Sequence, residues 1–183
     1  AKGGPPPAWL EAGMVVEVAM TEEGLVGSRY RVKVLEVAAQ TAHIEHEAFN
    51  AETEDGEESE EMLREWVPFA QLSEVPPPPP AGFFERLKVG APLEVLFDEG
   101  WWKVTLLEVL SGGEHEAAPY RVGSVVLDPA TGSELVHVES ADMRIESMRA
   151  AAELRPRWSR DANTGGWCAP EGAVPGLRVG GAA

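Results

Sequence analysis

Two adjacent tryptophans follow an acidic turn in the stretch FDEGWWKVTLLEV, which begins at Phe97, and these residue types suit the binding of a cation. An aromatic ring face attracts positive charge, and a methylated ammonium group suits an aromatic cage because it is bulky and weakly hydrated. Phe97 and Trp101 would supply ring faces, with Tyr120 as a third wall. The carboxylates of Asp98 and Glu99 would attract the ammonium group. The sequence therefore predicts a cation-binding site made of these five residues.

Residues that alternate along a strand point to opposite faces, which separates the two tryptophans. Trp102 shares one face with Val104 and Leu106, so we expect it to lie in a core. Trp101 shares the other face with Lys103 and is expected to be at least partly exposed. Only Trp101 is then available to a ligand.

No residue pattern of an enzyme or a metal site accompanies this stretch. His43 and His46 fall on opposite faces of one predicted strand, so they cannot share a zinc ion. The sequence has neither a G-x-S-x-G nucleophile elbow nor a phosphate-binding G-x-x-x-x-G-K loop. We therefore expect no catalytic residue, no metal, no cofactor and no enzymatic activity.

The elements that would position the site are short β-strands in two copies. GMVVEV at 13–18 resembles GAPLEV at 90–95, and RYRVKVLEV at 29–37 resembles WWKVTLLEV at 101–109. This order of similar segments indicates a duplicated module. In the alignment Tyr30 matches Trp102, and Arg29 matches Trp101. Short strands separated by glycine-rich or acidic turns predict an all-β chain of two tandem SH3-like, Tudor-like antiparallel barrels packed together.

Proline-rich stretches suggest the domain limits. The run VPPPPPAG at 75–82 would be a stiff spacer, since no helix or central strand contains such a run. We expect domain 1 at 9–80 and domain 2 at 83–170, with flexible tails at 1–8 and 171–183. The strand ELVHVES is expected in domain 2. The stretch ADMRIESMRAAAEL, at 141–154, fits either a short helix or an irregular return strand.

Charge and composition narrow the class of partner. The 183 residues carry a net charge of −16, and residues 1–80 alone hold 16 acids against 5 bases. Nucleic-acid binding is not expected, because its affinity comes from Lys and Arg contacts with phosphates. A basic partner fits this charge. The acidic segment at 50–61 is either a solvated loop or a surface that attracts such a partner. No apolar run is long enough to suggest a membrane span. We expect the protein to be a monomer.

Several of these motifs together resemble the plant Agenet domain, a member of the Tudor-like Royal superfamily. GMVVEVAMTEEGLVGSRYRVKVLEV looks like the opening of a first module, and LREWVPFAQLSEVPPPPP looks like its end. GAPLEVLFDEGWWKVTLLEV looks like the start of a second module, which closes with ELRPRWSRDANTGGW. The resemblance covers residues 11–168. It implies a non-enzymatic nuclear chromatin module that binds a methylated lysine on the tail of histone H3, or another basic peptide.

This chain departs from the family pattern at three positions. Family motifs place tryptophan where Arg29 stands, tyrosine where His46 stands, and an aromatic residue near Ser124. Domain 1 would then lack a full aromatic cage, and its possible ligand contacts are Tyr30, Arg29, His46 and Phe49. Two alternatives stay open. One is a degenerate Agenet pair that acts as a protein scaffold without reading methyl-lysine. The other is RNA binding through the basic strand face that begins at Arg29, which the net charge disfavours.

Overall fold

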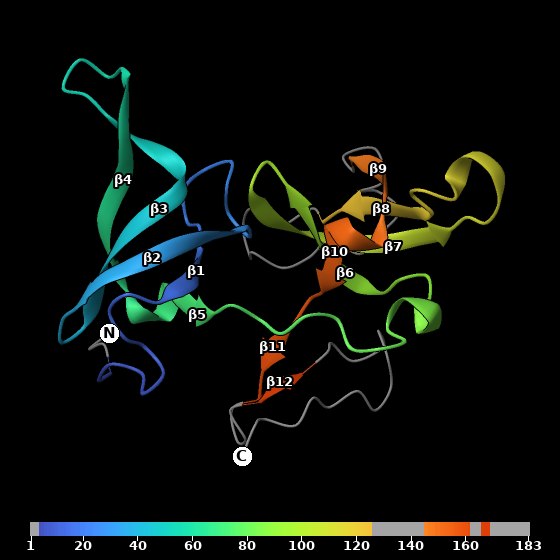
Figure 1. Cartoon of the computed structure of the whole chain (residues 1–183), viewed down its shortest axis with the longest axis horizontal. Helices are drawn as coiled ribbons and strands as arrows, with labels where there is room; N and C mark the ends of the chain where they lie inside the picture. The colour runs from blue at the N-terminus through green and yellow to red at the C-terminus, as the bar shows by residue number, and fades with distance from the viewer. Residues whose placement is uncertain (1–3, 126–144, 162–165, 169–183) are drawn as a thin grey trace. The chain divides into compact units, whose positions relative to one another are not determined.

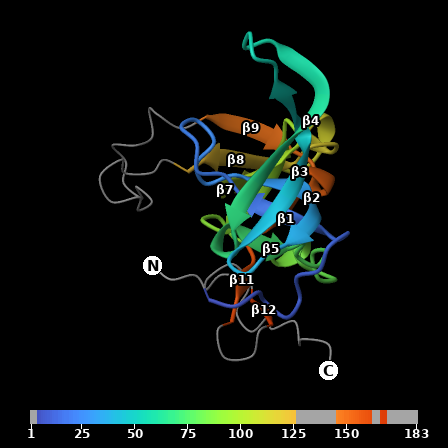
Figure 2. The same ribbon diagram turned by 90° about the vertical axis from the view of Figure 1, so that its left-hand side faces the viewer.

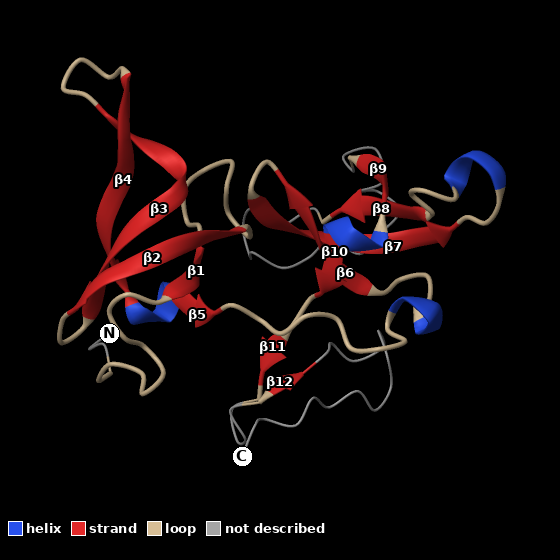
Figure 3. Cartoon of the chain, in the orientation of Figure 1, coloured by secondary structure: helices blue, strands red, loops and turns tan. Residues whose placement is uncertain are grey.

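The computed structural model describes residues 4–125, 145–161 and 166–168. By their contacts the residues form two compact units. Unit 1 comprises Ala1–Val75 with Asp98–Trp101, and unit 2 comprises Pro76–Phe97 with Trp102–Ala183. In the described part the strands are joined by loops and single 3-10 turns (Figure 3). The expected all-β class with antiparallel sheets is confirmed. No helix among the described residues is long and apolar enough to cross a membrane.

Unit 1 is an antiparallel meander in which β1 pairs with β2, β2 with β3 and β3 with β4, and β5 returns to pair with β1. The third and fourth strands form a long hairpin, which two views show in full (Figures 1 and 2). Its elements are β1 (Val15–Ala19), β2 (Arg29–Val37), β3 (Thr41–Glu52), β4 (Glu58–Pro68), η1 (Phe69–Gln71) and β5 (Leu72–Glu74).

Alternation along β2 builds the core of unit 1. Tyr30, Val32 and Val34 are buried, whereas Arg31 and Lys33 between them are exposed. β-branched residues suit such a pleated, half-buried strand because they pack well against cross-strand neighbours. The core face expected for this strand is confirmed.

Unit 2 repeats the same order of pairing, since β6 pairs with β7, β7 with β8, β8 with β9, and β10 returns to β6. Its elements are η2 (Phe84–Arg86), β6 (Pro92–Phe97), β7 (Gly100–Val109), η3 (Gly113–His115), β8 (Tyr120–Ser124), β9 (Glu146–Arg149), η5 (Ala151–Glu153), β10 (Leu154–Pro156), β11 (Ser159–Arg160) and β12 (Trp167–Cys168).

The duplication extends to single hydrogen bonds. Gly13 N donates to Val34 O at 2.7 Å in unit 1, and Gly90 N donates to Leu106 O at 2.7 Å in unit 2. Each glycine has a φ near +91°, a backbone conformation that favours glycine. The sequence repeat is therefore a structural repeat.

Each unit also buries one glutamate at the same point of its first strand. Glu17 lies opposite Ser73, and Glu94 lies opposite Arg155. In unit 2, Arg155 Nε lies 3.1 Å from Glu94 Oε1, and both side chains are less than a tenth exposed. In unit 1 a guanidinium comes instead from β2, where Arg29 Nη1 donates to Ser73 Oγ at 2.6 Å. The two copies therefore place an arginine near the returning strand in different ways.

The described part of the stretch 141–154 is a return strand and not a short helix. Within 145–154 the chain forms strand β9 and the 3-10 turn η5, as a return strand requires, and it forms no α-helix. The first part of that stretch, the strand expected at ELVHVES and the tail 171–183 lie outside the described residues.

Candidate functional site

A groove of about 340 Å³ lies within unit 2, where β6 ends and β7 begins. Side chains from β8, β9 and the residues flanking them complete its wall. Its lining is largely apolar and consists of Val95, Phe97, Trp102, Lys103, Val104, Ser124, Val125, Ile145, Ser147 and Arg149. A concave apolar site with a few polar groups is the usual form of a ligand-binding site. We call this site the groove.

Two aromatic side chains line the groove. Phe97 is 56% exposed, so its ring is open to a ligand. Trp102 is half-buried, because one part of it packs against the core of unit 2. Its indole Nε1–H donates to the carbonyl oxygen of Phe97 at 3.2 Å, which fixes the orientation of the ring. Sequence alternation predicted Trp102 in the core. The structure places it at the edge of the core, where it also lines the groove.

A cation already lies against one of these rings. The guanidinium carbon of Arg149 is 5.7 Å from the centroid of Phe97, within the range of a cation–π interaction. Arg149 Nε donates to Ser147 Oγ at 3.0 Å, and Nη1 donates to Glu153 Oε1 at 3.1 Å. A backbone hydrogen bond from Ala150 and then the bond from Arg149 lower the pKa of Glu153, whereas partial burial opposes this shift. The carboxylate that holds Arg149 is therefore stabilised in its charged form.

The charges of the groove are positive. Lys103 and Arg149 belong to its lining, which contains no carboxylate. Among the described residues no carboxylate forms an ion pair with Lys103. The hydroxyl of Ser124 is engaged, since it accepts a hydrogen bond from Ile145 N at 2.8 Å. The two charged residues of the lining, Lys103 and Arg149, are therefore both basic.

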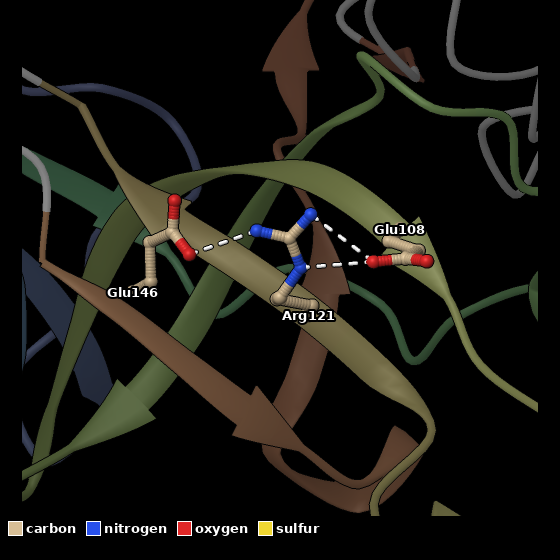
Figure 4. A network of polar contacts seen from close by, with 3 residues as sticks. All are labelled: Glu108, Arg121 and Glu146. Atoms are coloured by element: carbon tan, nitrogen blue, oxygen red, sulfur yellow. Dashed lines mark hydrogen bonds and ion pairs between the residues drawn. The ribbon is translucent and has the colours of Figure 1, made fainter. Parts of the chain in front are cut away.

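Strand β9, which carries Arg149, is tied to its neighbours by a second arginine (Figure 4). Arg121 on β8 lies between two carboxylates, and its Nη1 donates to Glu146 Oε2 at 2.8 Å. Its Nε donates to Glu108 Oε2 at 3.1 Å. The hydrogen bond that Arg121 donates to Glu146 is the largest cause of the raised pKa of Arg121. The network links β7, β8 and β9 and helps to set the position of the groove wall.

The structure separates the three aromatic residues that the sequence grouped as a cage. Phe97 lines the groove, but Trp101 and Tyr120 do not. Tyr120 is 9% exposed and belongs to the core of unit 2, where its ring lies 5.6 Å from that of Phe84. Burial and the nearby Glu85 raise its pKa. Trp101 belongs by its contacts to unit 1 and lies in register with Arg29. Of the three expected walls, the structure therefore brings only Phe97 to the groove.

Asp98 and Glu99 form the two-residue turn between β6 and β7. Both have positive φ, at 48° and 65°, as the central residues of a type I′ turn require. Both side chains are exposed, and neither lines the groove. Their first role in the structure is therefore to turn the chain.

We predict that Glu99→Gly stabilises the protein by about 1 kcal/mol, because a non-glycine residue in the left-handed region costs about 1–2 kcal/mol and glycine removes most of that cost. Urea unfolding of the two proteins measures the difference. Asp98→Gly is the matched comparison and should gain less, since aspartate tolerates this conformation better than glutamate does. A loss of stability in Glu99→Gly would contradict the account of the turn.

The candidate contacts of domain 1 lie in unit 1, where three of them pack together and Arg29 has a separate partner. Tyr30 is 2% exposed and lies 4.7 Å from Phe49 between ring centroids, and His46 is 1% exposed and lies edge-on to Phe49. His46 Nε2 lies 3.3 Å from Glu65 Oε1. Arg29 is bound to Ser73. These four residues therefore make packing and structural contacts, and the buried rings are not open to a ligand.

Several groove residues that come from other strands or faces were not predicted from the sequence, among them Lys103, Ile145 and Arg149. Arg149 and Ile145 belong to the return segment about fifty residues after Phe97, and nothing in their local pattern points to that ring. Lys103 was assigned to the face opposite Trp102, yet both line the groove. The core position of Tyr120, in contrast, was predictable from the sequence. Tyr120 alternates with Val122 and shares the core face of β8. Among the described residues no cluster of His, Cys, Asp and Glu could hold a metal ion.

Two units with one repeated strand order and buried cores define a tandem of Tudor-like barrels. The crystal structure of Arabidopsis thaliana AGDP1 AGD34 is similar, with a TM-score of 0.54 and 23% identity, and the match covers 87% of this chain and 88% of that one. The crystal structure of ADCP1 tandem Agenet domain 3-4 matches with a TM-score of 0.51 and 22% identity, over 87% and 86% of the two chains. The chain therefore has the fold of a tandem Agenet domain.

A curated protein supports the same conclusion from sequence. AGENET DOMAIN (AGD)-CONTAINING P1 of Arabidopsis thaliana is 29% identical over 116 residues, which are 59% of this chain. The match spans only 22% of that protein. No family model matches the chain. The resemblance to tandem Agenet domains inferred from the sequence motifs is confirmed.

Proposed function

We propose that the chain is a non-enzymatic chromatin module of the nucleus that binds a basic peptide, with the methylated tail of histone H3 as its ligand. The tandem Agenet fold supports this proposal, as does the relative whose name carries the Agenet domain. A net charge of −16 favours a basic partner. The ligand would enter the groove of unit 2.

One observation carries the proposal: the ring of Phe97 already accepts a cation. A guanidinium lies 5.7 Å from its centroid. A methylated ammonium group is bulky and weakly hydrated like a guanidinium, so the same ring face suits it. Trp102 supplies a second aromatic wall of the groove, in place of the Trp101 that the sequence favoured. The proposed contacts are therefore Phe97 and Trp102.

The acidic charge of unit 1 would raise the encounter rate with such a peptide. Seven acidic residues and no basic ones lie between Glu52 and Glu61, on the far part of the β3–β4 hairpin (Figure 1). Glu52 and Glu58 lie directly opposite each other in the strand register, where like charges repel. Most of these side chains are exposed. The negative electrostatic potential of these residues attracts cationic peptides, and this attraction weakens as the salt concentration rises.

A calorimetric titration with trimethylated and unmodified histone H3 peptides tests the proposal. We expect the trimethylated peptide to bind more tightly, because the methyl groups add apolar surface and weaken hydration of the charge. Trp101→Ala should keep this preference, since Trp101 does not line the groove. Equal affinity for the two peptides, or no binding of either, would contradict the proposal.

A second candidate is a scaffold that binds a partner protein without reading methyl-lysine. The positive lining of the groove favours it, since Lys103 and Arg149 suit an acidic segment with an apolar anchor. An acidic peptide that binds the groove more tightly than either histone peptide would support the scaffold over the reader.

A further inference from the structure

The ring face of Phe97 that would receive the ligand is occupied by a residue of the protein itself. Arg149 places its guanidinium carbon 5.7 Å from the ring centroid, and the two residues line one groove. A single ring face accommodates one cation at this distance. Any ligand cation that uses this face must therefore take the place of Arg149.

Several contacts hold Arg149 in this position. Ser147 accepts a hydrogen bond from its Nε at 3.0 Å, and Glu153 accepts one from its Nη1 at 3.1 Å. Glu153 is itself fixed, because its other oxygen accepts a hydrogen bond from Ala150 N at 3.0 Å. The side chain of Arg149 is only 20% exposed. Its place over Phe97 is therefore a defined arrangement with partners at both ends of the guanidinium.

We propose that Arg149 is an internal competitor for the ligand cation, so that it sets how tightly the groove binds a methylated lysine. The inference rests on the proposed function and adds a residue that controls it. A bulky methylated ammonium competes for the ring better than a strongly hydrated free ammonium does. Displacement of Arg149 costs the same free energy for every ligand that uses this ring face, so it raises the threshold for binding, and only the better competitor overcomes it at low concentration.

Removing the competitor should tighten binding. Arg149→Met keeps an unbranched apolar stem but no charge, and it leaves the face of Phe97 open. A cation–π contact at a partly exposed site is worth about 0.5–1 kcal/mol, so we expect affinity for the trimethylated H3 peptide to rise about two- to fivefold. Affinity for the unmodified peptide should rise by a similar factor, because both peptides no longer have to displace Arg149.

Lys103→Met separates competition from simple charge repulsion. It removes the same charge from the same groove, but among the described residues Lys103 makes no ring contact. Competition predicts a larger gain for Arg149→Met than for Lys103→Met, whereas repulsion alone predicts equal gains. Arg160→Met is the control outside the groove, since Arg160 lies 4.8 Å from the ring centroid of Trp167. It should leave the affinity unchanged.

A spectroscopic readout follows the displacement directly. The Nε–Hε resonance of Arg149 should shift when the trimethylated peptide is added, because the guanidinium leaves the ring current of Phe97. In Glu153→Gln, which loosens the hold on Arg149, the same shift should occur at lower peptide concentration. Circular dichroism of each variant checks that it is folded.

The outcomes separate this inference from the proposed function. If the wild type binds the trimethylated peptide but Arg149→Met binds no more tightly than Lys103→Met, the competitor role is wrong and the proposed function stands. If the Nε–Hε resonance of Arg149 does not shift when the peptide saturates the protein, the competitor role is likewise wrong and the proposed function stands. If neither the wild type nor Arg149→Met binds the trimethylated peptide, both proposals fall.

Discussion

Replacing Arg155 with methionine should destabilise unit 2 by about 3–5 kcal/mol, the usual loss when one partner of a buried ion pair is removed. Arg155 and Glu94 are 7% and 5% exposed, and Arg155 Nε lies 3.1 Å from Glu94 Oε1. No other described cation forms an ion pair with Glu94. The variant therefore leaves a buried carboxylate without its partner. Hydrogen exchange of the paired backbone amides of β6 and β10 measures the loss within unit 2.

Two comparisons show whether the buried charge is the cause. The double variant Glu94→Leu, Arg155→Met replaces the whole pair by apolar groups and should recover most of the stability. Arg121→Met breaks the more exposed network with Glu108 and Glu146 and should cost far less, because solvent screens those charges. If Arg155→Met and Arg121→Met have equal effects, the buried pair is not the support that the structure indicates.

Replacing Phe97 with alanine should lower affinity for the trimethylated H3 peptide about two- to fivefold, a net loss of about 0.5–1 kcal/mol, because the cation–π contact of the ligand and the competing contact of Arg149 are lost together. Phe97 is 56% exposed, so this change removes the ring face of the groove at little cost to the core. The preference for the trimethylated over the unmodified peptide should disappear. Calorimetric titration of both peptides measures both effects.

Trp66→Ala is the matched control for this variant. Trp66 is also a large exposed aromatic, at 49%, but it lies on β4 in unit 1 and stacks on His43. Its removal should leave the affinity for both peptides unchanged. Phe97→Leu adds a second comparison, since it keeps apolar volume without the ring quadrupole and should retain only part of the affinity. A full wild-type affinity in Phe97→Ala would remove the basis of the proposed site.

The fold was predictable because its strands obey a simple period. Tyr30, Val32 and Val34 alternate with charged residues, and the second copy repeats the pattern at Val104 and Leu106. Alternation assigns a residue to a face but does not say where along the strand the core ends. Trp102 is on the predicted face, yet β7 extends past the core at that end, so the ring is half-buried and lines the groove.

The site was predictable only where its residues are close in sequence. Phe97 was found because it borders the turn that brings β6 to β7. Arg149 was not found, because its contact with Phe97 depends on the pairing of β9 with β8 and on the bonds to Ser147 and Glu153. Local patterns do not contain such long-range pairing. Tyr120 is a different case, because its alternation with Val122 already pointed to the core, where the structure places it.

Mapping a trimethylated H3 peptide onto the isotopically labelled chain by NMR shows where the ligand binds. The largest changes are expected in the groove, at the indole Nε1–H of Trp102 and at the resonances of Phe97 and Ile145. Smaller, salt-dependent changes are expected on the β3–β4 hairpin, where the contact is electrostatic. Changes confined to that hairpin, or an unmodified peptide that gives the same pattern and affinity, would contradict the assignment of the groove as a methyl-lysine site.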